Sequence, residues 1–243
     1  MITNAKSADE FIAAHRGFLG FLADFQANCP VLSVAEVIAQ AGGPQHAALV
    51  TVDAVKGFCS QGPMSSPRVA RIVPEVTRII EAAAAAGVEN FLFTCDSHRP
   101  DSSEFAIWPA HCVEGTPEAE LEDALLHLPQ AEKFVIVPKP SINSLISTEL
   151  VQKLEAIQPK VLIAMGDVTD LCYYQLAANL KMLAVAKGWD CRVIAPLSAV
   201  ETYDTPLSTA EELGILPHDG DFINAFFSYH LQVTGVEVVK DLR

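Results

Sequence analysis

The chain is short of positive charge and of the features that mark membrane proteins. It has 16 Lys and Arg against 30 Asp and Glu, a formal net charge of −14, and no run of basic residues. Such a balance repels nucleic acid and anionic lipid. No apolar run reaches the roughly 18 residues that a membrane helix needs, and the N-terminal sequence lacks the basic start and apolar stretch of a signal peptide. We therefore expect a soluble, cytoplasmic protein that binds a small molecule and has no nucleic-acid or membrane partner.

The chain also lacks any Cys-x-x-Cys pair. Its six cysteines lie in apolar surroundings, which is typical of reduced, buried thiols rather than of a disulfide framework. They are Cys29, Cys59, Cys95, Cys112, Cys172 and Cys191. One of them could still be a reactive thiol.

Short apolar runs rich in Val, Ile and Phe alternate with segments of helical spacing through most of the chain. Nearly continuous apolar strands indicate burial on both faces, so the pattern predicts a parallel sheet covered by helices on both sides. The predicted strands span 47–53, 90–96, 133–139, 160–166, 192–198 and, less distinctly, 236–242. The predicted helices among them span 68–86, 147–157, 170–187 and 222–233. Ligands of such sheets bind at the carboxyl ends of the strands.

Residues 1–45 have a different pattern from the rest. Two amphipathic helices, over 8–26 and 33–41, precede a Gly-Gly-Pro turn at 42–44, and no residue of this segment indicates chemistry. We predict an N-terminal helical extension over 1–45 and one α/β domain over 46–243. The extension would pack on the outside of the domain or make a subunit contact, which would make the protein a homo-oligomer.

Three chemically versatile residues end or follow strands of the predicted sheet. Asp53 ends the first strand, Lys139 ends the third, and Cys172 follows the fourth where a helix should begin. Alone, each has an ordinary explanation as a turn-forming Asp, a solvated Lys and a core Cys. Because the carboxyl ends of parallel strands meet at one edge of a sheet, the three could instead converge on one crevice.

A thiol, an ammonium and a carboxylate in one crevice are suited to amide hydrolysis. A helix N-terminus and the Lys139 ammonium are expected to lower the pKa of the Cys172 thiol, which attacks only as thiolate. Asp53 could take the thiol proton and later hand it to a leaving amine. The backbone N–H groups of Val168 and Cys172 could face the oxyanion of a tetrahedral intermediate.

The segment after the second strand contains residue types that bind metals. Asp96 and His98 are one residue apart, so in an extended chain their side chains point the same way. His111 follows a loop that contains Glu104. Mixed nitrogen and oxygen ligands suit catalytic Zn²⁺, and Fe²⁺ or Mn²⁺ would also accept them. On spacing alone, a solvated polar loop without a metal is the commoner arrangement.

Taken together, these motifs resemble the nicotinamidase branch of the isochorismatase-like cysteine hydrolases. The segments VDAVKGF, TCDSHRP, WPAHCVEGTPEAEL, VPKPSINSL and GDVTDLC occur in the family's order over about residues 47–195. The WPAHCVEGTPEAEL segment is highly specific. The resemblance implies a three-layer α/β/α domain with a six-stranded parallel sheet.

The resemblance also implies roles for individual residues. The catalytic triad would be Asp53, Lys139 and Cys172. In the family the metal binds the pyridine nitrogen of the substrate and helps to hold the hydrolytic water. Its ligands here would be Asp96, His98 and His111, with Glu104 matching an additional ligand position of some members. Phe58 and Trp108 would be the aromatic walls around the pyridine ring, although core packing explains such residues in an arbitrary protein. The peptide bond between Asp167 and Val168 would be cis.

The chain departs from the family's pattern at several positions. The family usually reads D-x-Q-x-D-F after the first strand, whereas residues 53–58 read Asp-Ala-Val-Lys-Gly-Phe. Asp167 replaces an apolar residue, and Leu145 stands where an aromatic residue is common. Three hypotheses stay open. The first is a metal-dependent cysteine amidase of NAD salvage that hydrolyses nicotinamide to nicotinic acid and ammonia. The second is a related enzyme for another amide, such as a carbamoyl or ureido compound, and the third is a non-catalytic binding protein.

Overall fold

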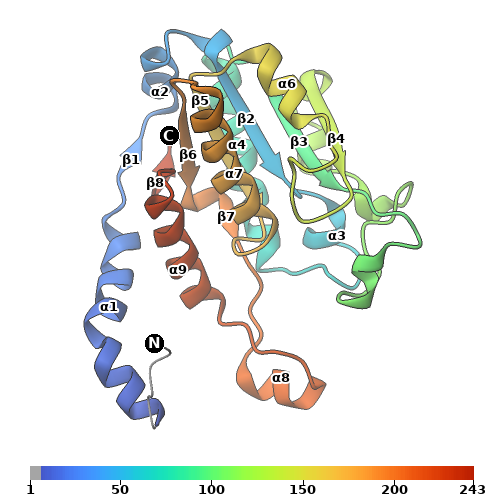
Figure 1. Cartoon of the computed structure of the whole chain (residues 1–243). Coiled ribbons are helices and arrows are strands. Elements are labelled where there is room, and N and C mark those ends of the chain that lie inside the picture. Colours follow the sequence, from blue (N-terminus) through green and yellow to red (C-terminus); the bar gives the residue numbers. More distant parts are fainter. Residues whose placement is uncertain (1–6) are drawn as a thin grey trace.

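Six parallel strands form the path of the central sheet, as predicted (Figure 1). The computed structural model describes residues 7–243, so residues 1–6 of the predicted extension lie outside the described residues. The strands are β2 (Ala47–Val52), β3 (Phe91–Asp96), β4 (Phe134–Lys139), β5 (Val161–Asp167), β6 (Arg192–Pro196) and β8 (Glu237–Val239). Their order in the sheet is β4-β3-β2-β5-β6-β8, and every neighbouring pair is parallel.

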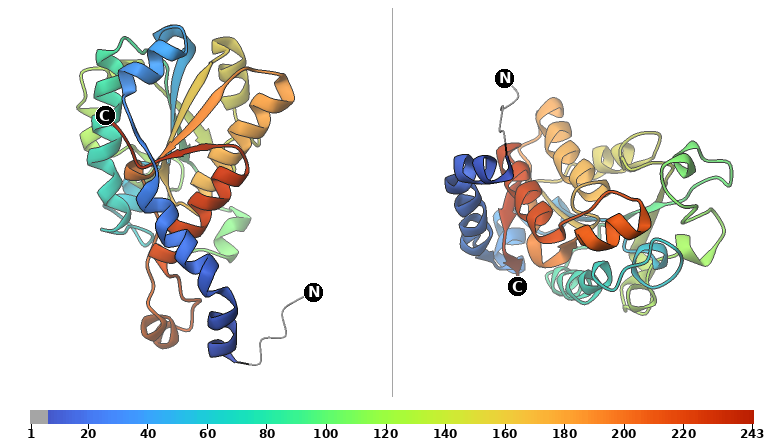
Figure 2. Two further views of the ribbon diagram at one scale, coloured as in Figure 1. Left: turned by 90° about the vertical axis from the view of Figure 1, so that its left-hand side faces the viewer. Right: turned by 90° about the horizontal axis from the view of Figure 1, so that it is seen from below.

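Helices cover both faces of the sheet, which makes the fold a three-layer α/β/α sandwich (Figure 2). One face packs against α2 (Val34–Gln40), α4 (Ile72–Ala85) and α5 (Asp123–Leu126). The other packs against α6 (Leu150–Ile157), α7 (Cys172–Lys187) and α9 (Gly220–Val233). Successive side chains of a strand point to opposite faces, so Leu49 enters the first core and Val50 the second. This two-sided burial explains why the central strands are apolar throughout.

The structure differs from the predicted elements mainly in short segments. β7 (Val200–Glu201) adds a seventh strand to the sheet by pairing with the end of β5. The predicted strand over 236–242 divides into β8 and β9 (Asp241–Leu242), and β9 pairs with β1 (Val31–Leu32) in a separate sheet. The helices α3 (Lys56–Cys59) and α8 (Leu207–Leu213) lie outside the predicted elements, because such short segments show no clear period. The short 3₁₀ turns are η1 (Pro44–His46), η2 (Val69–Arg71), η3 (Ser103–Ala106), η4 (Pro117–Ala119), η5 (Ala131–Lys133) and η6 (Leu197–Ala199).

The N-terminal segment divides into a projecting helix and a packed one. α1 (Ala8–Asn28) lies against α9, where Phe18, Phe21 and Phe25 meet the ring of Tyr229 edge-on. The other end of α1 projects beyond the sheet (Figures 1 and 2). α2 instead contributes buried residues to the first core. The division of the chain at residue 45 stays a prediction.

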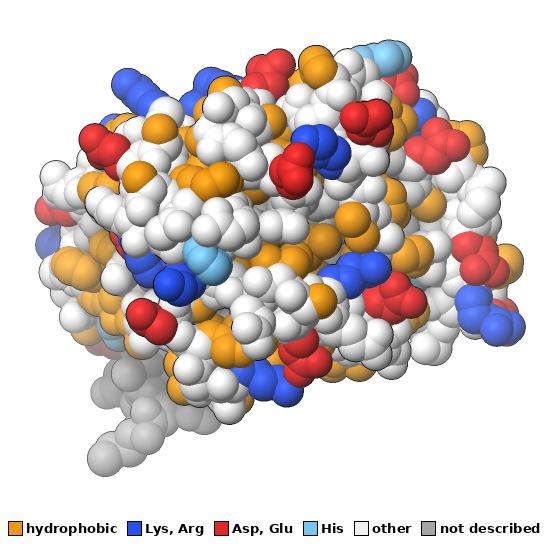
Figure 3. Space-filling model, turned by 90° about the horizontal axis from the view of Figure 1, so that it is seen from above, with side chains coloured by type: hydrophobic (Ala, Val, Ile, Leu, Met, Phe, Trp, Pro, Cys, Tyr) orange, Lys and Arg blue, Asp and Glu red, His pale blue; other side chains and the backbone are white. Residues whose placement is uncertain are grey.

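Two expectations from composition concern the surface and the thiols. On the face seen in Figure 3, acidic and basic side chains are interspersed, and the view shows no dense basic area. All six cysteines are buried and free, as predicted. Within residues 7–243, no helix is both long and apolar enough to cross a membrane.

Gly166 allows β5 to pass close to β2 next to the candidate site. Its φ of 120° is strained for residues with a side chain, and a Cβ there would collide with the backbone of Val52. We expect Gly166→Ala to lower the free energy of unfolding by about 3 kcal/mol, from strain and overpacking together. Urea denaturation would measure the change. Gly188→Ala is the matched control, because Gly188 also has a positive φ of 67° but nothing lies within 4 Å of its Cβ position. An equal decrease in the free energy of unfolding of the two variants would show that the contact of Gly166 with Val52 does not matter.

Candidate active site

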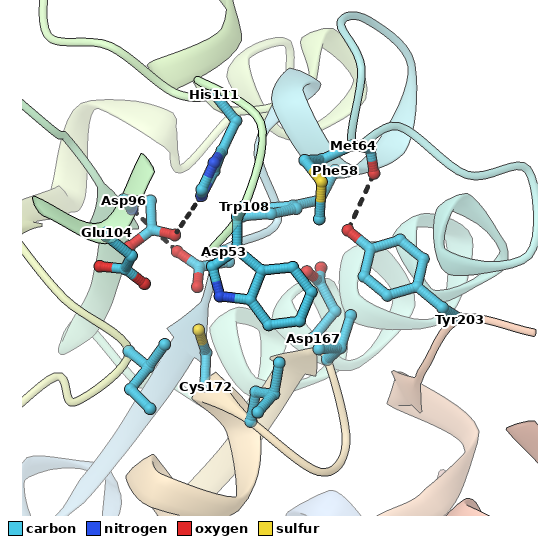
Figure 4. Close-up of a pocket in the computed structure, with 13 residues that line it drawn as sticks. Asp53, Phe58, Met64, Asp96, Glu104, Trp108, His111, Asp167, Cys172 and Tyr203 are labelled. Carbon is cyan, nitrogen blue, oxygen red and sulfur yellow. Dashed lines mark hydrogen bonds and ion pairs between the residues drawn. The ribbon is translucent and has the colours of Figure 1, made fainter. Parts of the chain in front are cut away.

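Asp53, Lys139 and Cys172 meet in one buried cluster at the carboxyl ends of the strands. Figure 4 shows Asp53 and Cys172 of this cluster in the cavity that they line. Nζ of Lys139 lies 2.8 Å from Oδ2 of Asp53 and 3.4 Å from Sγ of Cys172. Lys139 also forms an ion pair with Asp96. An oxygen of each carboxylate and the sulfur lie within 4.8 Å of one another. The cluster thus places a carboxylate and an ammonium beside a thiol.

The pairing of the strands explains this convergence. Lys139 is the direct partner of Asp96 in the register of β3 and β4, so the two side chains emerge together. Val52 pairs on one side with β3 and on the other with β5, so Asp53 emerges between them. Asp53 has a φ of 57°, a left-handed conformation that Asp tolerates better than most residues. Its Oδ1 accepts a hydrogen bond of 2.8 Å from the backbone N–H of Asp96.

Two buried carboxylates share the one ammonium of Lys139. Burial, and then repulsion from Asp96, raises the pKa of Asp53 to about 6, although Lys139 opposes this shift. Burial also acts on Asp96, but the attraction of Lys139 and the contacts with His111 and His98 outweigh it and lower its pKa. Burial disfavours the charged form of Lys139, yet the two carboxylates hold its pKa well above the ordinary value. Asp53 is therefore the carboxylate better suited to accept a proton.

The predicted lowering of the pKa of Cys172 is wrong. Burial raises the pKa of this thiol well above its ordinary value, and the attraction of the nearby Lys139 ammonium offsets only part of the effect. The sequence could place a cation near the sulfur but could not show how completely both are removed from water. A mechanism at this site therefore needs a base that takes the thiol proton during attack, and Asp53 is adjacent.

The turn before Cys172 contains free backbone donors. The peptide bond between Asp167 and Val168 is cis, as the resemblance implied. Among the described residues, the N–H groups of Val168 and Cys172 have no hydrogen-bond partner. Both residues also line the cavity that holds the thiol. These donors are therefore available to an oxygen atom of a ligand.

Asp96, His98 and His111 form a second buried cluster beside the first. One ligand atom of each residue lies within 4.8 Å of the others. Nε2 of His98 is 3.4 Å and Nε2 of His111 is 3.7 Å from Oδ2 of Asp96, too far for good hydrogen bonds. Glu104 lies farther out, with Oε2 3.8 Å from Nδ1 of His98. A backbone bridge between His98 and Val113 holds the two histidine-bearing segments together.

The second cluster fits a divalent metal ion. Both ring nitrogens of His98 are buried and have no hydrogen-bond partner among the described residues. Nδ1 of His111 donates to the carbonyl oxygen of Pro109 at 2.8 Å, which leaves Nε2 free to bind a cation. Buried, unpaired imidazole nitrogens beside a carboxylate are costly unless a ligand satisfies them. Asp96, His98 and His111 are thus the residues that could hold the ion, with Glu104 at the edge.

A single cavity joins the two clusters. Phe58 and Trp108 line it, as do Asp53, Asp96, Glu104, His111 and Cys172. His98 lies behind this wall, buried completely. The cavity also contains residues outside the predicted set, which are Met64, Ile142, Asp167, Leu171 and Tyr203. Asp167 alone had a signal in the sequence, because the family that the motifs resemble has an apolar residue at this position. Met64, Ile142 and Tyr203 come from loops without periodic pattern, and Leu171 directly precedes α7.

Comparisons with known proteins identify a family and similar folds. Residues 47–200 match the model of a family described as Isochorismatase domain. Nicotinamidase 1 of Arabidopsis thaliana is 28% identical over 215 residues, which cover 80% of this chain and 85% of that protein.

Among solved structures, the fold is similar to that of two enzymes. The pyrazinamidase of Pyrococcus horikoshii, in complex with zinc, is 22% identical with a TM-score of 0.63, over 80% of this chain and 99% of that one. N-carbamoylsarcosine amidase from Thermoplasma acidophilum is 23% identical with a TM-score of 0.60, over 80% of this chain and 95% of that one.

Proposed function

The chain belongs to the isochorismatase domain family as an amide hydrolase, and we propose that it converts nicotinamide to nicotinic acid and ammonia through a thioester on Cys172. The observation that carries the proposal is the placement of Asp53 and Lys139 around the sulfur of Cys172, next to the cluster of Asp96, His98 and His111. The similarity to a plant nicotinamidase supports the choice of substrate.

Attack begins with proton transfer from Cys172 to Asp53. Because burial keeps the thiol protonated, the carboxylate of Asp53 takes the proton as the sulfur attacks the amide carbon. Lys139 stabilises the negative charge on sulfur from 3.4 Å. The carbonyl oxygen then carries the negative charge, which the N–H groups of Val168 and Cys172 stabilise.

Collapse of this intermediate breaks the carbon–nitrogen bond. Protonated Asp53 gives its proton to the leaving nitrogen, so ammonia departs and the acyl group stays on Cys172 as a thioester. A water molecule then attacks the thioester carbon while Asp53 removes a proton from it. The carbon–sulfur bond breaks, the acid leaves and the thiol regains its proton. Phe58 and Trp108 would hold the pyridine ring from two sides.

A divalent metal, Zn²⁺ by preference, would be held by Asp96, His98 and His111, with Glu104 as an additional ligand. When bound, it supplies a Lewis acid that orients the substrate and lowers the pKa of a bound water molecule. Fe²⁺ and Mn²⁺ accept the same ligand types.

The direct test is an assay for ammonia and nicotinic acid with purified protein, nicotinamide and added Zn²⁺. We expect turnover with kcat within the common enzyme range of about 1–10³ s⁻¹. No release of ammonia from the folded, metal-loaded protein would contradict the proposal.

Removing an imidazole should weaken metal binding. We expect His98→Ala to lower the affinity for Zn²⁺ by more than about 100-fold, since even outer partners of metal ligands are worth about 10–100-fold. Elemental analysis after dialysis against a weak chelator would measure the bound metal. His127→Ala is the control, because His127 is exposed and neither lines the cavity nor belongs to the cluster of Asp96, His98 and His111. Equal zinc content in both variants would exclude His98 as a ligand.

A second candidate function is hydrolysis of another amide, such as a carbamoyl or ureido compound. It is favoured by the altered loop over 53–58 and by Asp167 in the cavity wall. An ammonia assay on a panel of such amides beside nicotinamide, compared by kcat/KM, separates the two functions.

A further inference from the structure

Asp167 is a buried acid without a partner in the wall of the candidate active site. Its side chain is 0% exposed, and neither carboxyl oxygen has a hydrogen-bond partner among residues 7–243. It nevertheless lines the same cavity as Cys172 and Asp53. Burial, and then repulsion from Asp53, raises its pKa well above the ordinary value, which favours the neutral form of the carboxyl group.

Asp167 lies on a different side of the cavity from Asp96 and His111, two of the residues that could hold a metal ion. Figure 4 shows its carboxyl group toward Phe58, Met64 and Tyr203, whereas Asp96 and His111 lie on the other side of the cavity. The sulfur of Cys172 lies below both groups in the view. A small amide with its carbonyl carbon at the sulfur therefore presents one flank to Asp96 and His111 and another to Asp167.

The surrounding protein does not use this carboxyl group. The nearby hydroxyl of Tyr203 donates instead to the carbonyl oxygen of Met64 at 2.8 Å. The hydroxyl of Thr169 donates to Asn224 at 2.6 Å. A buried polar group without a partner destabilises a fold, so an apolar residue would serve the fold better at this position. The carboxyl group is best explained by a partner that arrives with the ligand.

We propose that Asp167 determines substrate specificity by hydrogen bonding to a hydroxyl or amino group on the flank of the substrate that faces away from Asp96 and His111. The inference rests on the proposed amide hydrolysis and narrows its substrate class. A neutral carboxyl group donates one hydrogen bond and accepts another, as hydroxyl and amino groups also do. We therefore expect an amide with such a second polar group to be hydrolysed with a higher kcat/KM than nicotinamide itself.

The test compares nicotinamide with its monohydroxy and monoamino derivatives in wild type, Asp167→Leu and Asp167→Asn. For at least one derivative, we expect kcat/KM relative to nicotinamide to fall by about 10-fold or more in the Leu variant. The Asn variant, which still donates and accepts, should keep most of the preference. An unchanged ratio for every derivative in folded Asp167→Leu would overturn the proposal.

Two further measurements separate this inference from its premise. In a Cys172→Ala background, calorimetric titration with the same compounds reports binding without turnover, and Asp167→Leu should weaken binding of the polar derivative selectively. This binding result does not depend on whether the wild type releases ammonia. Failure of the proposed hydrolysis can therefore be distinguished from failure of the inference about Asp167. The melting temperature of Asp167→Leu should equal or exceed that of the wild type, because an unpaired buried group is removed. A clear decrease would show that the carboxyl group serves the fold and would overturn the proposal.

Discussion

Cys172→Ala is expected to lower kcat for nicotinamide hydrolysis by about 10⁴-fold or more while the protein stays folded. In the proposed mechanism the sulfur is the protein atom that bonds covalently to the substrate, and enzymes that lose their nucleophile commonly retain only a small residual rate. The side-chain partners of the thiol are Lys139, at 3.4 Å, and Asp53. These two also pair with each other at 2.8 Å, so removal of the thiol leaves the strands and helices in place. Ammonia release under saturating nicotinamide would measure the loss.

The matched control for this experiment is Cys191→Ala. Both thiols are 6% exposed, and neither forms a disulfide. Cys191 lies next to β6, outside the cavity. The control variant should keep wild-type kcat. Rapid acid quenching of the wild type during turnover should also reveal a mass increase equal to the acyl group on Cys172. Full activity of Cys172→Ala, or comparable losses in the two variants, would exclude the thioester mechanism.

The sequence predicted the convergence of the triad because parallel strands have a simple geometry. Asp53 and Lys139 each end or follow an apolar run, and any residue in that position reaches the same edge of the sheet. The outcome did not depend on knowing the order of the strands. The sequence did not predict the contact between Asp96 and Lys139, because this contact depends on the register of β3 and β4. Register is set by packing across the whole sheet and is not readable from either strand alone.

The sequence could not predict the direction of the pKa shift of the Cys172 thiol, for a related reason. The pKa of Cys172 depends on the balance between burial and the attraction of Lys139. A sequence places an ammonium near a sulfur, but burial depends on every residue that covers the site. Met64 and Tyr203, which line the cavity, come from segments without helix or strand periodicity. Asp167 was visible in the sequence as a departure from an apolar position, and only the structure shows that its oxygens lack partners.

Lys139→Met is expected to lower the free energy of unfolding by about 3–5 kcal/mol in the metal-free protein and to abolish amide hydrolysis. Removing one partner of a buried ion pair leaves the other charge unpaired, and here two carboxylates lose the same ammonium. Lys139 is completely buried at the end of an edge strand, so water does not replace it. Urea denaturation in the presence of a chelator would measure the loss of stability.

Two comparisons show whether the loss comes from the unpaired carboxylates. Lys133→Met removes an ammonium that is 2.6 Å from Glu89, but this pair lies on the surface and its removal should have little effect. Adding Asp53→Asn to Lys139→Met removes one of the two stranded charges, so the double variant should be more stable than Lys139→Met alone. A double variant that is less stable than Lys139→Met would mean that packing of the lysine stem, rather than its charge, holds the strand ends together.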